Sequence, residues 1–273
     1  MRIIHMSDLH LTRGGCPIWE TNTMEHFNQS IDIIRGMQNI DAILVTGDIS
    51  DDGSEWTYQY ADRSFSILGI PTLCCPGNHD ALKMMLEEYK PSFYQILPPS
   101  YKIEGWKIVM LNSVTPADES PDQNKARGFL SDESLDYVKQ ELEEGLPTII
   151  ALHHPPLEPG GWLNRRLLEN RDEFNQIINS YPNARLVIYG HIHYFTEVQQ
   201  CHIKYSSSTS VGFAFDKDLP KFQIAAGLEG LSLIEIDNDL IDITNVKLYN
   251  MFCNNQRSNF TTVPLKWTNR SLN

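Results

Sequence analysis

Five short polar clusters in this chain each follow an apolar, β-like run of residues. In order they are Asp8-Leu9-His10, Gly47-Asp48, Gly77-Asn78-His79-Asp80, His153-His154 and Gly190-His191-Ile192-His193. Because the carboxyl ends of strands in an open α/β sheet face one crevice, side chains from distant clusters can converge there. Alternate residues of an extended segment share a side, so both members of an Asp-x-His or His-x-His pair can point into that crevice. The sequence therefore predicts one polar site built from five separate segments.

The donors in these clusters are carboxylate, imidazole and amide groups, which suit hard or borderline metal ions such as Mn, Fe, Zn, Co or Mg. Seven donors are too many for one tetrahedral site, but they suit two ions that share a carboxylate at the ~3.5–4 Å spacing of two-metal hydrolases. We therefore expect two divalent or trivalent ions as cofactors. The expected ligands are Asp8, His10, Asp48, Asn78, His153, His191 and His193, with His154 as the alternative to His153.

Short β-rich runs alternate with amphipathic stretches as far as His193. We predict strands over residues 2–6, 42–46, 72–75, 107–111, 148–152 and 185–189, and helices around 24–34, 56–68, 131–144 and 166–180. Beyond His193, the runs 197–205, 231–236 and 241–248 predict a β meander with a turn at 237–239. This order predicts an α/β fold, with two packed sheets flanked by helices as the favoured arrangement and one open sheet as the alternative.

The composition indicates a globular protein. The chain has 273 residues, of which 41% are hydrophobic and 21% charged, close to the usual values for globular domains. Five cysteines without zinc-type spacing predict reduced thiols. The N-terminus does not resemble a signal peptide and no apolar run approaches ~20 residues, so we expect a cytoplasmic protein without a membrane partner. A net charge of −13 argues against a nucleic-acid polymer as partner, although bound cations can reverse the field locally.

We expect one domain over residues 1–249. The polar segment 250–273 would then be a tail, a lid or a subunit contact, the last of which would make the protein a homodimer.

The ordered motifs Asp-x-His, GD, GNHD, a histidine two residues before Pro155, and GHxH resemble those of the calcineurin-like metallophosphoesterase superfamily. The resemblance implies a four-layer αββα sandwich of two mixed β-sheets flanked by helices, in which Asp48 bridges two metal ions. The other ligands would divide into a first set of Asp8, His10 and His193 and a second set of Asn78, His153 and His191.

Further roles are expected next to the metals. Asn78, His79 and His193 would contact the substrate, and His79, which is surplus to the metal coordination, would bind the phosphate or act as the catalytic proton donor to the leaving oxygen. The resemblance implies that a catalytic carboxylate orients His79, with Asp51 as the first choice and Asp52 or Asp80 as alternatives.

Further stretches are similar to the bacterial 3′,5′-cyclic AMP phosphodiesterases, also called class III cyclic nucleotide phosphodiesterases. They are residues 47–52 with Ser54 and Tyr58, Trp162-Leu163 with Leu168 and Asn170, and residues 207–211 with Phe215. The similarity implies hydrolysis of a small phosphodiester, foremost 3′,5′-cyclic AMP, by attack of a metal-bridging hydroxide. Glycerophosphodiesters, 2′,3′-cyclic nucleotides and other phosphoesters are the alternatives, because a fold does not fix a substrate.

Charge near the motifs favours a diester. No Arg or Lys adjoins the metal motifs to bind the second charge of a monoester, although Arg13, Arg165, Arg166 and Lys217 lie in loops that could approach. Trp162, Phe213 and Phe215 could stack on a purine or only pack against one another. A non-catalytic binding module of the same fold would lack several ligands, and a nuclease would carry basic segments; this sequence shows neither feature.

Overall fold

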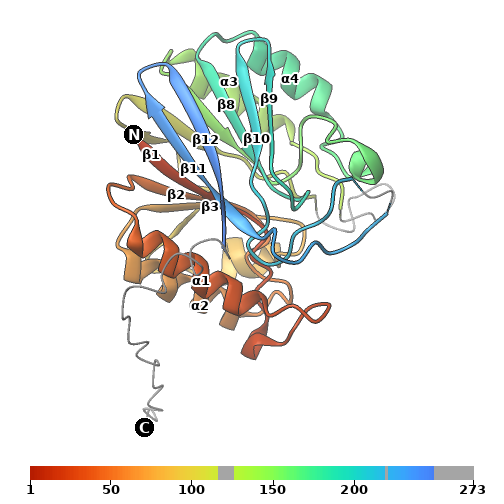
Figure 1. The fold of residues 1–273 in the computed structure, drawn as a ribbon. Coiled ribbons are helices and arrows are strands. Elements are labelled where there is room, and N and C mark those ends of the chain that lie inside the picture. Colours follow the sequence, from red (N-terminus) through yellow and green to blue (C-terminus); the bar gives the residue numbers. More distant parts are fainter. Residues whose placement is uncertain (116–125, 219–220, 249–273) are drawn as a thin grey trace.

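The computed structural model describes residues 1–115, 126–218 and 221–248, which form two mixed six-stranded β-sheets (Figure 1). The first sheet has the order β12 (Leu240–Lys247), β11 (Gly230–Asp237), β1 (Arg2–Met6), β2 (Ala42–Thr46), β3 (Thr72–Cys75) and β4 (Gln95–Ile96). The second has the order β5 (Tyr101–Ile103), β6 (Trp106–Met110), β7 (Thr148–Ala151), β8 (Ala184–Tyr189), β10 (Ile203–Ser207) and β9 (Thr196–Gln200). In each sheet four neighbouring strands are parallel, and the other strands pair antiparallel at the edges.

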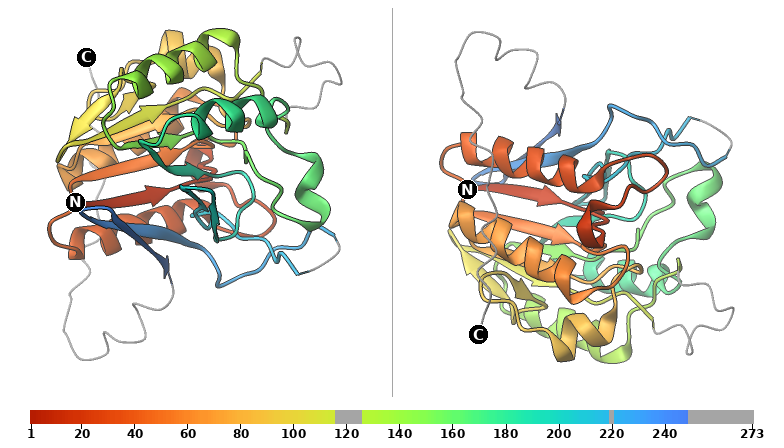
Figure 2. Two further views of the ribbon diagram at one scale, coloured as in Figure 1. Left: turned by 90° about the horizontal axis from the view of Figure 1, so that it is seen from above. Right: turned by 90° about the horizontal axis from the view of Figure 1, so that it is seen from below.

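Helices cover the outer face of each sheet (Figures 1 and 2). The helices α1 (Thr23–Gly36) and α2 (Glu55–Leu68) share a core with the first sheet, and α3 (Asp132–Glu143) and α4 (Arg171–Asn179) share one with the second. A third core fills the space between the sheets. Residues of β2 alternate between two of these cores, because Val45 faces the helices whereas Leu44 faces the other sheet. The predicted αββα sandwich is confirmed, and the alternative of one open sheet is wrong.

The predicted strands agree closely with the structure. The first three have the predicted bounds, and the next three differ by no more than one residue at either end. The last predicted helix is wrong in its first turn, since α4 begins at Arg171. The amides of Leu168 and Glu169 instead donate to the carbonyl oxygens of Pro155 and Gly128, so this segment belongs to a loop network. A short 3₁₀ helix, Gly161–Arg165, precedes it.

The predicted β meander is wrong. The run 197–205 contains two strands, β9 and β10, which turn at Cys201 and extend the second sheet. The hairpin of β11 and β12 extends the first sheet, and its predicted turn is confirmed because Asp237 pairs with Leu240. The intervening segment crosses between the sheets, where the amides of Val211 and Gly212 donate to the carbonyl oxygens of Ser7 and Asp8.

Loops collect at the carboxyl ends of the parallel strands, opposite the N-terminus (Figure 2). The predicted C-terminal segment 250–273 lies outside the described residues. In the described residues, none of the helices has the length and apolar character needed to cross a membrane. The cysteines within those residues, Cys16, Cys74, Cys75 and Cys201, are free thiols.

Candidate metal centre

All seven predicted metal ligands meet where the two sheets present their carboxyl ends. The first sheet supplies Asp8 and His10 after β1, Asp48 after β2 and Asn78 after β3, and the second supplies His153 after β7 with His191 and His193 after β8. All except Asn78 are buried or nearly so, and Asn78 lines the cavity at this end of the molecule. The site therefore depends on the packing of the two sheets against each other.

The backbone at this site is in an unusual conformation. Asp8, His10, Asp48, His191 and His193 all have positive φ, between 46° and 71°. Non-glycine residues rarely adopt this region, and such strain is characteristic of functional sites. Neighbouring loops hold the conformation, since the amides of Asp8 and His10 donate to the carbonyl oxygens of Gly47 and Asp48 at 3.1 and 2.9 Å. Each strand thus ends in a sharp bend that points its side chain into the site.

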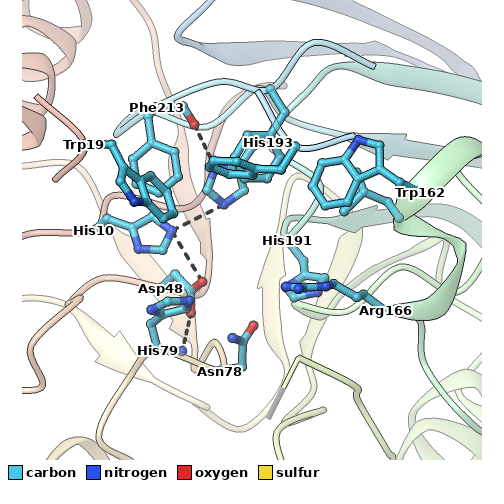
Figure 3. A pocket seen from close by; sticks show the side chains of 13 residues that line it. His10, Trp19, Asp48, Asn78, His79, Trp162, Arg166, His191, His193 and Phe213 are labelled. Carbon is cyan, nitrogen blue, oxygen red and sulfur yellow. Dashed lines mark hydrogen bonds and ion pairs between the residues drawn. The ribbon is translucent and has the colours of Figure 1, made fainter. Parts of the chain in front are cut away.

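One group of donors comprises Asp8, His10, Asp48 and His193. The Nε2 atoms of His10 and His193 are 3.3 Å apart, and that of His10 lies 3.5 Å from a carboxylate oxygen of Asp48 (Figure 3). The Nε2 of His193 lies 3.3 Å from a carboxylate oxygen of Asp8. The Nδ1 of His193 faces the carbonyl oxygen of Phe213 at 2.7 Å, and the Nδ1 of His10 faces Asp51 at 3.0 Å. Both Nδ1 atoms must donate to these acceptors, so when both rings are neutral two Nε2 lone pairs face each other. A bound cation resolves that contact, because both lone pairs can then donate to it.

The second group comprises Asn78, His153 and His191. His153 donates from Nδ1 to the carbonyl oxygen of Thr46 at 2.7 Å, which leaves its Nε2 lone pair 3.0 Å from Oδ1 of Asn78. The Nδ1 of His191 lies 3.2 Å from the same Nε2, and the buried Nε2 of His191 has no hydrogen-bond partner. Two acceptors so close together, with Nδ1 of His191 beside them, fit a second cation.

Asp48 joins the two groups. Its Oδ2 lies 3.5 Å from Nε2 of His10 in the first group and 3.5 Å from Nε2 of His153 in the second. The amide of His79 donates to its other oxygen, Oδ1, at 2.8 Å. One carboxylate therefore faces both sets of donors, as a ligand shared between two ions would.

His154 lies in the same cluster, since it offers a ring nitrogen within 4.8 Å of nitrogens of His153 and His191. Its Nδ1 contacts Oγ of Ser113 at 2.9 Å, and its buried Nε2 has no hydrogen-bond partner within the described residues. Of the two adjacent histidines, it is His153 that lies against Asp48 and Asn78.

Burial controls the charge of two of the ligand histidines, His10 and His191. Burial lowers the pKa of His10 and takes that of His191 well below its usual value, in each case against the pull of nearby carboxylates. Burial would raise the pKa of Asp8, but the neighbouring His193, His153 and His10 outweigh that effect and hold the pKa well below its usual range. Neutral imidazoles beside an ionised carboxylate are the protonation states that a metal ion requires.

His79 and Asp51 form a pair at the edge of these groups. One oxygen of Asp51, Oδ1, lies 3.1 Å from Nδ1 of His79 and 3.0 Å from Nδ1 of His10. The His79 side chain is 45% exposed and lines the cavity. Burial opposes its protonation, but the hydrogen bond to Asp51 and the charge of Asp48 outweigh burial and raise the pKa of His79 to about 9. Bound cations would act in the opposite direction.

The two alternative carboxylates, Asp80 and Asp52, accept hydrogen bonds from groups other than His79. Asp80 accepts hydrogen bonds from the amides of Ser50 and Gly77 and from the Tyr58 hydroxyl. Asp52 accepts from the amides of Arg13 and Ser54. Neither contacts His79, so Asp80 and Asp52 fix the loops that carry the site.

We expect Gly77→Ala to disturb the site through close packing. A Cβ at this position would overlap both the carboxylate and the amide of Asp48, and such overpacking costs roughly 1–3 kcal/mol. Urea unfolding should show that loss of stability together with weaker metal binding. The control is Gly36→Ala at the end of α1, where a Cβ meets nothing within 4 Å. Equal stability and metal content in the two variants would show that the close approach is not required.

The groups open into a cavity of about 360 Å³. Its lining includes Arg166, one of the loop cations that the sequence left open, and the aromatic residues Trp162, Phe213 and Phe215. Trp19 and Phe222 also line it. No motif marks these last two residues in the sequence.

Comparison with known proteins identifies the fold family. The sequence model of calcineurin-like phosphoesterases matches residues 1–195. The chain belongs to the calcineurin-like phosphoesterase family. A 3′,5′-cyclic-nucleotide phosphodiesterase of Nostoc sp. is 31% identical over 243 residues, which cover 87% of this chain and 88% of the relative. A 3′,5′-cyclic adenosine monophosphate phosphodiesterase of Escherichia coli is 28% identical over 206 residues, covering 71% and 70%.

A solved structure agrees with this assignment at the level of the fold. A dimetal phosphatase from Danio rerio superposes with a TM-score of 0.64 at 11% identity, over 90% of this chain and 96% of that chain. As a member of the calcineurin-like phosphoesterase family, the protein is a metal-dependent hydrolase of phosphoric esters that uses two metal ions.

Proposed function

We propose that the protein hydrolyses a small phosphodiester, with 3′,5′-cyclic AMP as the best-supported substrate. The position of Asp48 Oδ2 between His10 and His153 carries the two-metal part of this proposal. The names of the relatives in Nostoc sp. and Escherichia coli support the substrate. Glycerophosphodiesters and 2′,3′-cyclic nucleotides are the competing substrates within the same chemistry.

The first ion would be held by Asp8, His10, Asp48 and His193, and the second by Asp48, Asn78, His153 and His191. When bound, the two cations would polarise the phosphoryl oxygens and lower the pKa of water to near neutrality. No residue of the chain then has to act as a covalent nucleophile.

The chain's own residues would complete the reaction. His79 stands at the cavity with Nδ1 engaged by Asp51, so its Nε2 would donate a proton to the departing alkoxide or a hydrogen bond to the phosphate. Asn78 and His193 would lie against the same phosphate from opposite donor groups. Arg166 adds a positive charge to the cavity lining, which favours binding of an anionic ester.

Asp51→Asn tests the two contacts of the Asp51 carboxylate, one with His10 and one with His79. Because Asp51 faces both His10 and His79, we expect kcat and metal affinity each to fall by roughly 10- to 100-fold. Metal analysis after dialysis and steady-state kinetics measure the two effects. Asp52→Asn is the matched control, since the adjacent carboxylate contacts no histidine in the described residues. A loss of turnover with unchanged metal affinity would show that the contact between Asp51 and His10 does not support metal binding.

The substrate is tested by kinetics of the Mn²⁺-loaded protein on a panel of esters. The panel holds 3′,5′-cyclic AMP, 2′,3′-cyclic AMP, a glycerophosphodiester and a phosphomonoester. We expect the highest kcat/KM for 3′,5′-cyclic AMP. A higher kcat/KM for the monoester than for every diester would overturn the diesterase proposal, and Arg166 would then be the first candidate for binding the second charge. Preference for another diester would overturn only the choice of substrate.

A further inference from the structure

Five aromatic rings line the cavity at the candidate metal centre, and Figure 3 labels three of them, Trp19, Trp162 and Phe213. The five rings belong to Trp19, Trp162, Phe213, Phe215 and Phe222, and we call them the aromatic rim. Two of its members are unusually open to solvent, since Trp19 is 56% exposed and Phe222 42% exposed. Large apolar side chains gathered at the mouth of a polar cavity are a common mark of a binding surface.

Trp19 combines a strained backbone conformation with an exposed side chain. Ile18 and Thr21 exchange backbone hydrogen bonds at 3.0 and 2.8 Å, so Trp19 and Glu20 are the central residues of a two-residue turn. Both have positive φ, 45° and 65°, as in the hairpin turns that normally use Asn-Gly. A tryptophan in this conformation is strained, and its high exposure means that little burial offsets the strain.

The ring of Trp19 also lacks a parallel partner within the described residues. Its neighbours Phe213 and Phe222 lie 5.0 and 4.8 Å away, at interplanar angles of 75° and 63°. By contrast, Phe215 already stacks on His193 at 4.3 Å and 5°. The indole plane of Trp19 is therefore available for a flat ring from outside.

This ring lies close to the donors of the metal centre. The ring of Phe213 is 4.6 Å from that of His10 and 5.0 Å from that of Trp19. A single aromatic ring thus separates the indole from a candidate metal ligand. A ribose can bridge such a span, so a phosphate at the metals and a planar base at Trp19 can belong to one nucleotide.

We infer that Trp19 and Phe222 form a stacking subsite for the heterocyclic base of a nucleotide ester. The inference rests on the proposed function, because it places the phosphate at the metal centre. Stacking would make this chain select base-bearing esters over esters of the same charge without a ring. Since stacking of one base on an aromatic side chain contributes roughly 1–3 kcal/mol, the selection should reach roughly 5- to 150-fold.

Competitive inhibition separates the base from the phosphate. The inhibitors are AMP and ribose 5-phosphate, which differ by the base, and the reporter reaction is hydrolysis of bis(p-nitrophenyl) phosphate by the Mn²⁺-loaded protein. We expect AMP to inhibit at least about fivefold more tightly than ribose 5-phosphate. Trp19→Asn and Phe222→Ala should each reduce that ratio and leave the inhibition constant of ribose 5-phosphate unchanged. Trp56→Ala, which removes a tryptophan stacked on Tyr60 in α2, should keep the wild-type ratio.

If Trp19 served only to stabilise the fold, Trp19→Asn would lower the thermal midpoint. The subsite predicts instead that the midpoint stays equal or rises, because asparagine suits the left-handed turn better than tryptophan. A ratio near one in the wild type, or a ratio that both rim variants preserve, would overturn the inference. That result would leave diester hydrolysis standing. A ratio that depends on Trp19 without hydrolysis of 3′,5′-cyclic AMP would instead uphold the subsite and overturn the proposed substrate.

Discussion

We expect Asp48→Asn to abolish hydrolysis and to weaken binding at both metal positions. A neutral amide would replace a carboxylate whose Oδ2 lies 3.5 Å from both His10 and His153, so one substitution removes charge from two sites. The loss of turnover should exceed the roughly 100-fold that follows when a ligand loses only its outer hydrogen-bond partner. Metal content measured by mass spectrometry and turnover of an activated diester give the two readouts.

The control for Asp48→Asn is Asp242→Asn, which makes the same chemical change on β12. It should keep the wild-type metal content and rate. An Asp48→Asn protein that retained two equivalents of metal and normal turnover would show that Asp48 does not join the two groups.

The second large effect is expected for His79→Ala, which should slow turnover by roughly 10²- to 10⁴-fold, the usual yield of general acid–base catalysis. Metal content should not change, because the ring of His79 lies outside both donor groups and 45% of its side chain is exposed. The deficit should shrink for p-nitrophenyl esters, whose leaving group needs no proton. Such a dependence on the leaving group identifies proton donation.

His202→Ala is the control for His79→Ala, since His202 is exposed and its Nε2 contacts the carbonyl oxygen of Tyr181, away from the metal centre. It should leave both turnover and metal content unaltered. If His79→Ala slows p-nitrophenyl and alkyl esters equally, binding of the phosphate accounts for the effect and proton donation does not.

The sequence predicted which side chains converge because the clusters follow simple local rules. Each cluster comes after a buried strand, and parallel strands deliver their carboxyl ends to one edge. That reasoning located Asp8, Asp48 and His191 without knowledge of their contacts. It could not show that their backbones have positive φ, because neither periodicity nor propensity reports a strained bend that tertiary contacts impose.

Choices between neighbouring residues needed the three-dimensional arrangement. Asp51 and Asp52 are adjacent and chemically identical, yet only Asp51 faces His79. The aromatic rim shows the same limit, since Trp19 and Phe222 are far apart in the sequence but have ring centroids 4.8 Å apart. Long-range packing decides such contacts.

The errors in the fold have a related cause. Strands β9 and β10 form an antiparallel hairpin, as β11 and β12 do, and the sequence of a hairpin does not say which sheet it joins. The backbone hydrogen bonds from Val211 and Gly212 to Ser7 and Asp8 fix the crossing between the sheets, and with it the sheet that each hairpin joins. Likewise, the turn before α4 is drawn into a loop network with Gly128, although its sequence is compatible with a helix.

Metal titration of the metal-free protein tests the two-ion centre most directly. Protein stripped with a chelator is supplied with increasing Mn²⁺, and both bound metal and hydrolysis of a phosphodiester are measured at each step. The two donor groups that meet at Asp48 predict no activity without metal and full activity at two equivalents per chain. Full activity at one equivalent, or hydrolysis that persists without metal, would contradict a mechanism that depends on two ions.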